Sequence, residues 1–194
     1  DSAPIARVLG DVPVISSAGR AFPVDVIYRP VQIRNRQQTD AVVAVIYEAL
    51  AEQSGSLLVF LPGAAEIRRV ENQLRGHLSE DVLLTPLYGN LKAEEQDRAI
   101  SPAADGTRKV VLATAIAETS LTIEGVRVVI NSGQQRRAVF DPNSGMTRLL
   151  TTRVSKASAE QRKGRAGRIE PGVCYRLWSA EEQATLTEFT PPEI

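Results

Sequence analysis

Leu57-Leu58-Val59-Phe60-Leu61 is an almost continuous apolar run of strand length, and Lys109-Val110-Val111-Leu112-Ala113 is a second one. A strand that is apolar along its whole length is buried on both faces, which is typical of parallel sheets covered by helices on both sides. Similar runs alternate with helical patterns along the chain. We therefore predict an α/β fold, a parallel sheet flanked by helices with right-handed crossovers.

The expected elements follow this alternation. We predict helices at residues 39–53, 64–78, 92–100 and 155–165, and strands at residues 24–28, 56–61, 82–87, 108–113, 126–131 and 172–178. Ligands of such sheets bind beyond the carboxyl ends of the strands. Three of these ends carry turn or small polar residues: Leu61-Pro62-Gly63, Tyr88-Gly89-Asn90 and Ala113-Thr114-Ala115. An inserted β-hairpin is predicted from residues 137–140 and 146–150, because Pro, Asn and Gly lie between them.

Length and composition bound the class of protein. The chain has 194 residues, of which 43% are hydrophobic, enough for one domain with extensions. No run of 18 apolar residues and no signal peptide is present, so we expect a cytoplasmic protein without a membrane partner. The single cysteine, Cys174, lies in an apolar run and is predicted to be a buried thiol. One histidine, His77, cannot build a metal site with one cysteine, so no metal site is predicted.

Charge is unevenly distributed along a chain whose formal net charge is zero. Residues 134–176 contain ten Lys and Arg residues against three acidic ones. A basic stripe of this kind is expected of a protein with a polyanionic partner. A merely solvated face is the alternative.

Residues 161–168, Gln-Arg-Lys-Gly-Arg-Ala-Gly-Arg, lie inside the basic segment. Arg165 and Arg168 are three apart, so on a helix they would share one face. Gly164 and Gly167 have the same spacing and would let another group approach the backbone closely. Paired guanidinium groups on a small-residue surface suit a polyphosphate, because arginine binds phosphate oxygens in a bidentate manner. Arg162 and Lys163 are predicted to be solvated.

Several motifs together resemble the DEAH-box subgroup of superfamily 2 helicases. Residues 161–168 resemble motif VI, residues 113–125 resemble motif V, and residues 58–63 resemble motif IV. Residues 87–91 resemble the segment between motifs IV and V, and the hairpin lies where this family places one. The tail Glu170-Pro171-Gly172-Val173-Cys174-Tyr175-Arg176-Leu177-Trp178 is similar to the bacterial HrpB-type branch.

This resemblance implies the second of two RecA-like motor domains of an ATP-dependent RNA helicase. Residues 1–22 would be an arm from the preceding RecA-like domain, residues 23–180 the second one, and residues 181–194 the connection to a winged-helix region. The sequence contains no Gly-x-x-x-x-Gly-Lys-Ser/Thr and no Asp-Glu-x-His. ATP and Mg²⁺ would therefore be held mainly by the first domain, and the isolated fragment is predicted to be inactive.

Roles carry over to matching positions. The resemblance implies that Gln161, Arg165 and Arg168 act at the β- and γ-phosphates of ATP. Thr122 and Glu124 would lie on the sugar and phosphate side of the nucleotide, and Ile100 would cover the base. RNA backbone contacts would come from Thr114, Gly63, Gly89 and Asn90.

Two positions depart from the family pattern. Ala115 replaces the usual Asn of motif V, and Asn131 replaces a usual Asp after the next strand.

A second class of function stays open at this point. The isolated domain could be a non-catalytic module that binds single-stranded RNA or a protein activator. The hairpin could be a surface excursion, or it could wedge against nucleic acid or the following domains.

Overall fold

The computed structural model describes residues 10, 22–31, 35–119, 121–141 and 145–190. Nearly all of the expected arm, residues 1–22, lies outside this part of the chain. The described elements are β1 (Val24–Tyr28), α2 (Asn35–Glu52), β2 (Ser56–Phe60), α3 (Ala64–Leu74), β3 (Val82–Leu87), α4 (Ala93–Ile100), β4 (Arg108–Ala113), α5 (Ile116–Thr119), β5 (Val126–Asn131), β6 (Gln134–Asp141), β7 (Met146–Arg153), α6 (Lys156–Lys163), β8 (Gly172–Arg176) and α7 (Ala180–Thr185).

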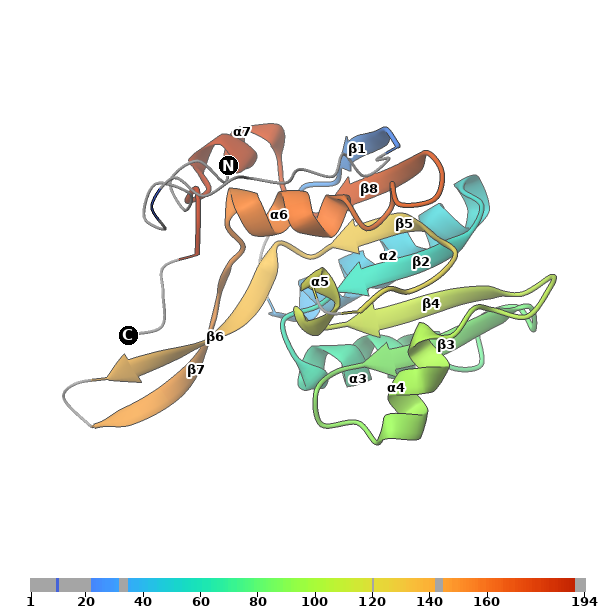
Figure 1. Cartoon of the computed structure of the whole chain (residues 1–194), viewed down its shortest axis with the longest axis horizontal. Coiled ribbons are helices and arrows are strands. Elements are labelled where there is room, and N and C mark those ends of the chain that lie inside the picture. The colour runs from blue at the N-terminus through green and yellow to red at the C-terminus, as the bar shows by residue number, and fades with distance from the viewer. Residues whose placement is uncertain (1–9, 11–21, 32–34, 120, 142–144, 191–194) are drawn as a thin grey trace.

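A six-stranded sheet in the order β1-β8-β5-β2-β4-β3 forms the centre of the molecule (Figure 1). Every neighbouring pair in it is parallel. Strand β2 lies near its middle and is buried along its whole length, as its continuous apolar run predicts. The predicted parallel α/β fold is therefore confirmed.

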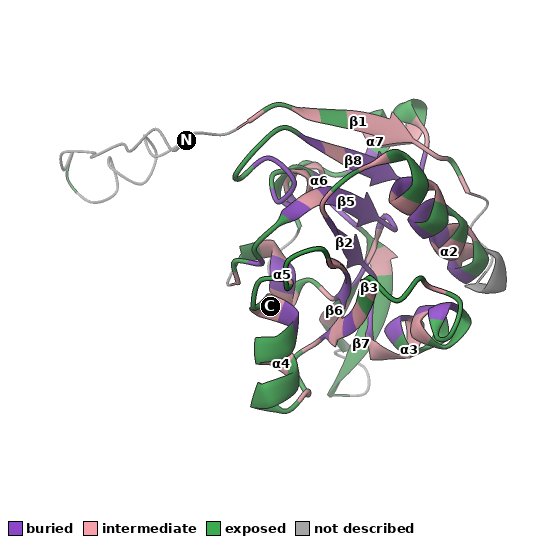
Figure 2. Ribbon diagram, turned by 90° about the vertical axis from the view of Figure 1, so that its right-hand side faces the viewer, coloured by how far each residue is buried: buried purple, intermediate pink, exposed green. Residues whose placement is uncertain are grey.

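Helices cover both faces of this sheet. Figure 2 shows α2 and α3 on one side of the buried strands and α4, α5 and α6 on the other. Helix α3 illustrates why: its buried residues Ile67, Val70 and Leu74 recur at helical spacing, so one stripe faces the sheet. Separate apolar cores lie on the two faces, one centred on Val59 and Ile46 and the other on Leu58 and Val129.

The antiparallel hairpin β6–β7 follows β5 and forms a separate two-stranded sheet. It projects away from the main sheet (Figure 1). The hairpin is longer than the sequence predicted, because pairing extends inward to Gln134 and Arg153. It therefore starts only three residues after the end of β5.

Several boundaries differ from the prediction. The first helix begins at Asn35 rather than near Thr39, and α3 ends at Leu74 rather than at residue 78. The short helices α5 and α7 were not predicted.

The most consequential difference is in α6, which ends at Lys163 rather than at residue 165. Gly164 is its C-cap, and two successive turns follow, closed by bonds from Arg165 N to Arg162 O and from Ala166 N to Lys163 O. Glycine weakens a helix, so the helix stops where the first one occurs.

Candidate functional site

The segment after α6 carries the two arginines that the sequence singled out. They lie on turns rather than on one helix face, so that prediction was wrong. Arg165 is only 5% exposed and donates from Nη1 to the carbonyl oxygen of Leu121 at 2.6 Å. Its Nη2 donates to the carbonyl oxygen of Glu118. Arg165 therefore holds the backbone between β4 and β5.

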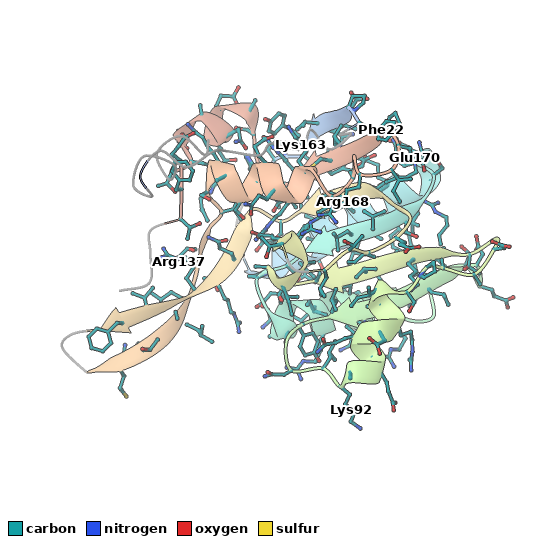
Figure 3. All side chains as sticks on the ribbon, in the orientation of Figure 1. Phe22, Lys92, Arg137, Lys163, Arg168 and Glu170 are labelled. Atoms are coloured by element: carbon teal, nitrogen blue, oxygen red, sulfur yellow. The ribbon has the colours of Figure 1, made fainter. Side chains whose placement is uncertain are left out.

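Arg168 has a different environment. It is exposed, and its Nη1 donates to Thr122 Oγ1 at 2.9 Å. Figure 3 labels it near the C-terminal end of α6. The structure thus brings Arg165, Arg168 and Thr122 together, as the resemblance implied. Thr122 is itself exposed, so both ends of this bond are open to a ligand.

Ion pairs neutralise only part of the positive charge on this segment. The described residues give Arg162 an ion pair with Glu118 and Lys163 one with Glu160, but they give no carboxylate partner to Arg165 or Arg168. Burial lowers the pKa of Arg165, the neighbouring positive charge of Arg168 lowers it further, and the negative charge of Glu118 raises it. Two adjacent guanidinium groups that form no ion pair with a described carboxylate are a candidate anion site.

The prediction that Arg162 is solvated was wrong. Its side chain is 0% exposed, and its Nε donates to Glu118 Oε1 at 2.6 Å. The buried residues of α6 are Ser158, Ala159 and Arg162, which share one helical face. Small residues three and four positions earlier were the signal that Arg162 points inward.

The remaining nucleotide candidates lie on three other parts of the fold. Gln161 is exposed on the last turn of α6. Glu124 is exposed just before β5, and Ile100 is half-buried at the end of α4. Glu124 lies two residues before the amino end of β5. Ile100 begins the connection from α4 to the amino end of β4.

The two glycines of this segment differ in their surroundings. A Cβ atom on Gly167 would lie 2.6 Å from Phe22 O and 2.7 Å from Val24 Cγ2. A Cβ on Gly164 would meet nothing closer than 3.5 Å. The predicted close approach is therefore real at Gly167, but the group that approaches is the start of β1.

The RNA candidates gather at the carboxyl ends of three adjacent strands. Thr114 follows β4, Gly63 follows β2, and Gly89 and Asn90 follow β3. Backbone bonds join these ends: Leu61 N donates to Ala113 O, and Thr114 N donates to Leu87 O. Asn90 and Gly89 are exposed and Thr114 is half-buried.

Gly63 is buried beneath a side chain of the hairpin. A Cβ there would lie 2.9 Å from Arg136 Cζ, and Arg136 pairs with Glu66 at 3.4 Å. A hollow of about 260 Å³ opens beside it, lined in part by Gln38, Pro62 and Gln134. An anionic ligand at this edge would meet the Arg136 guanidinium before it met Gly63.

The two sets of candidates lie at different ends of the sheet. Segment 114–125 runs from the carboxyl end of β4, where Thr114 lies, to the amino end of β5, past Thr122. Residues 164–171 lead into the amino end of β8, so the arginines lie on that side. One continuous segment therefore connects the RNA candidates with the anion site.

Other predictions concern single residues. Cys174 is buried, as predicted, and burial raises the pKa of its thiol to about 11. His77 is exposed. Within the described ranges, no group of three or more His, Cys, Asp or Glu side chains is placed to hold a metal ion. None of the described helices has the length and hydropathy needed to cross a membrane.

Comparison with known proteins identifies the family of the chain. The model of the helicase conserved C-terminal domain matches residues 38–170. The Escherichia coli ATP-dependent RNA helicase HrpB is 50% identical over the whole chain, and the Haemophilus influenzae ATP-dependent RNA helicase HrpA homolog is 37% identical over 97% of it. The mouse probable ATP-dependent RNA helicase DHX34 is 38% identical over 94% of the chain. The chain spans 24%, 14% and 17% of the lengths of these relatives, respectively.

A solved structure agrees with the sequence matches. The crystal structure of Escherichia coli DEAH/RHA helicase HrpB superposes with a TM-score of 0.91 at 49% identity. The match covers 99% of this chain and 24% of that one, and it confirms the expected RecA-like fold and the resemblance to the HrpB-type branch. The chain belongs to the helicase conserved C-terminal domain family.

Proposed function

We propose that this chain is the second motor domain of an ATP-dependent RNA helicase that works in the cytoplasm. One observation carries the proposal: Arg165 and Arg168 lie side by side, and no described carboxylate pairs with either. A pair of guanidinium groups that form no direct ion pair with a described carboxylate suits the phosphates of a nucleotide. The relatives' names support ATP and RNA as the ligands.

Arg168 is the residue best placed to reach a nucleotide held by another domain. Its guanidinium is exposed and held by a single bond to Thr122. Bound ATP with Mg²⁺ supplies the phosphoryl group whose hydrolysis drives the motor. Arg168 would bind the β- and γ-phosphate oxygens, where an arginine finger contributes about 10³–10⁵ in rate.

Neighbouring residues would complete the nucleotide site. Arg165 places a second positive charge beside Arg168 while it holds the backbone of residues 118–121. Gln161 is exposed one turn earlier and would orient the attacking water. Thr122 and Glu124 would face the sugar and phosphates, and Ile100 would cover one face of the base.

RNA would lie along the carboxyl edge of β2, β4 and β3. Thr114, Gly63, Gly89 and Asn90 offer backbone and small polar groups at adjacent strand ends. Such contacts hold the phosphate backbone and carry no sequence information. We therefore expect single-stranded RNA to bind this domain weakly and with little sequence preference. The affinity should fall as salt rises, with a shallow slope, because contacts to a few phosphates release only a few counterions.

The rest of the full-length protein would supply the other partners. Residues 1–22 would lead from a first RecA-like domain that holds ATP and Mg²⁺. Residues 23–180 would form the second domain, and residues 181–194 would lead to a winged-helix region. An activator protein is a further candidate partner.

A non-catalytic binding module is the alternative function. The hairpin favours it, because both faces of its outer part carry exposed apolar side chains: Phe140 and Leu149, 49% and 68% exposed, share one face, and Met146, 57% exposed, lies on the other. Exposed apolar side chains on a projecting element are typical of interaction surfaces.

Measurements of ATP hydrolysis distinguish a helicase motor domain from a non-catalytic binding module. We expect the 194-residue chain to show no sustained ATP hydrolysis, and a longer chain that includes the preceding domain to hydrolyse ATP faster when single-stranded RNA is added. The reason is that the sequence contains neither the phosphate loop nor the acidic motif that holds Mg²⁺. Sustained, chelator-sensitive hydrolysis by the short chain, or none by the longer one, would contradict the proposal.

A further inference from the structure

A fully buried arginine connects three parts of the proposed motor domain. Arg162 donates from Nε to Glu118 Oε1 at 2.6 Å and from Nη1 to Asn131 Oδ1 at 2.9 Å. Nη1 also donates to the carbonyl oxygen of Gln134 at 3.2 Å. The guanidinium carbon lies 4.9 Å from the centre of the Phe60 ring, within range of a cation–π contact.

Each partner belongs to a different functional segment. Glu118 is on α5, in the segment whose backbone Arg165 also holds. Asn131 ends β5, and Gln134 is the first residue of the hairpin. Arg162 itself lies on α6, immediately after Gln161. A single buried cation therefore joins the hairpin root to the segment that carries the nucleotide candidates.

The fork geometry of arginine is necessary for this arrangement. One nitrogen contacts the carboxylate of Glu118, and a second one contacts Asn131 and Gln134. A lysine ammonium is a single point and cannot reproduce both contacts. Glu118 is also held by Ser158 Oγ at 3.0 Å, so α5 would keep one contact to α6 without Arg162.

Asn131 connects Arg162 with the residues that lead into the hairpin. Its Oδ1 accepts from Arg162 and from the backbone N–H of Gly133 at 3.0 Å. Asn131 Nδ2 and Arg162 Nη2 are buried, and neither has a hydrogen-bond partner among the described residues. An aspartate at this position would keep both acceptor contacts of Oδ1 and replace the unpartnered Nδ2 with an oxygen.

We propose that Arg162 is a positioning residue that transmits the state of the hairpin to the nucleotide site, so that RNA contact at the hairpin accelerates ATP hydrolysis. This inference rests on the proposed helicase function. In this inference, Arg162 contacts neither ATP nor RNA. It fixes the hairpin root relative to α5, and α5 is tied through its backbone to Arg165.

The experiment compares ATP hydrolysis by the full-length protein with and without single-stranded RNA. We expect Arg162→Lys and Asn131→Ala to reduce the RNA stimulation ratio by about five-fold or more, the lower end of measured couplings between sites. The dissociation constant for a non-hydrolysable ATP analogue should not change. Asn131→Asp is the matched control, since it keeps the acceptor and should keep the stimulation.

A double-mutant cycle tests whether Arg162 affects ATP hydrolysis through the hairpin. Residues 137–150 are replaced by a two-residue Asn-Gly turn, which leaves the hairpin root in place. In this background, Arg162→Lys should change the stimulation ratio by no more than about two-fold, the scatter of independent effects. If the two effects multiply instead, or if the shortened hairpin keeps full stimulation, Arg162 does not act through the hairpin.

Further outcomes are also decisive. A purely structural role would lower basal and stimulated hydrolysis in parallel and leave their ratio unchanged, which would overturn the inference. If Arg162→Lys does not fold, Asn131→Ala and Asn131→Asp decide it alone. Absence of RNA-stimulated hydrolysis in the unmutated protein would instead contradict the proposed function itself.

Discussion

Gly164 and Gly167 show how differently one residue type is used within a single motif. At Gly167, a methyl group would overlap the backbone of Phe22 and the side chain of Val24. At Gly164, the backbone is right-handed helical with φ −59° and ψ −14°, and a Cβ would make only van der Waals contacts at 3.5 Å. Packing therefore requires glycine at position 167. At position 164, glycine is required only if a bound ligand approaches the backbone there.

This contrast gives a stability prediction. We expect Gly167→Ala to destabilise the protein by about 1–3 kcal/mol, the usual effect of forcing a methyl group into a packed site. Gly164→Ala is the control and should be neutral or stabilising by about 0.4–1 kcal/mol. Urea unfolding of the two variants checks this. Equal midpoints would show that β1 does not pack on this loop as described.

Cys174 gives a prediction about pH. Burial raises the pKa of its thiol from 9.0 to about 11, so the folded protein disfavours the thiolate. Below pH 9 the thiol is protonated in both the folded and the unfolded chain, so its ionisation does not change the free energy of unfolding. Between about pH 9 and 11 only the unfolded chain loses the proton, and stability should fall by about 2–3 kcal/mol, at about 1.4 kcal/mol per unit of pKa.

The measurement is the difference between wild type and Cys174→Ala. Other groups titrate in the same range, but they cancel in the comparison. The stability gap between the two proteins should shift in favour of Cys174→Ala as the pH rises from 8.5 to 11, values chosen to span the titration. A gap that stays constant over this range would mean that the thiol is accessible to solvent.

Among the elements, the hairpin is the one whose role the fold itself does not explain. Phe140 and Leu149 are exposed on one face of it, where Phe140 pairs with Thr147 and Leu149 with Ala138, so the two lie diagonally across the strands. Because they bury little surface, Phe140→Ser and Leu149→Ser should change stability by no more than about 0.5 kcal/mol. If the hairpin wedges against RNA or a following domain, both variants should lose strand separation in the full-length protein.

The control for the hairpin is Leu83→Ser. Leu83 is an exposed leucine on β3, the edge strand of the six-stranded sheet, to which the hairpin does not belong. It should leave strand separation unchanged. Normal unwinding by the hairpin variants would show that the hairpin is only a surface excursion.

Most strands were predictable from the sequence because a sheet buried on both faces leaves continuous apolar runs, as at β2 and β4. Short helices were not: α5 has four residues, too few for a periodic pattern. The site was predictable as a set of motifs. For the inward direction of Arg162, the small residues Ser158 and Ala159 were the only local signal, and it runs against the rule that a charged side chain is usually exposed. Its partner Glu118 is 44 positions away, a tertiary contact that local sequence does not reveal.

At the scale of the whole molecule, we propose that a second domain completes the anion site. Arg168 presents its guanidinium at the surface, and the described residues offer no phosphate-binding loop beside it. An arginine that acts only on the charge of the transition state changes kcat and leaves nucleotide binding largely intact. An arginine that merely stabilises the turn after α6 would lower stability and leave kcat near normal.

The most direct test is RNA-stimulated ATP hydrolysis by the full-length protein, with wild type, Arg168→Lys and Arg168→Ala measured in parallel. We predict that Arg168→Ala loses about 10³-fold or more in kcat with little change in the dissociation constant for ATP. Arg168→Lys should recover only a small part, because a point charge cannot reproduce the bidentate fork. A kcat for Arg168→Ala within a few-fold of wild type would contradict the assignment of this chain as the domain that supplies the arginine finger.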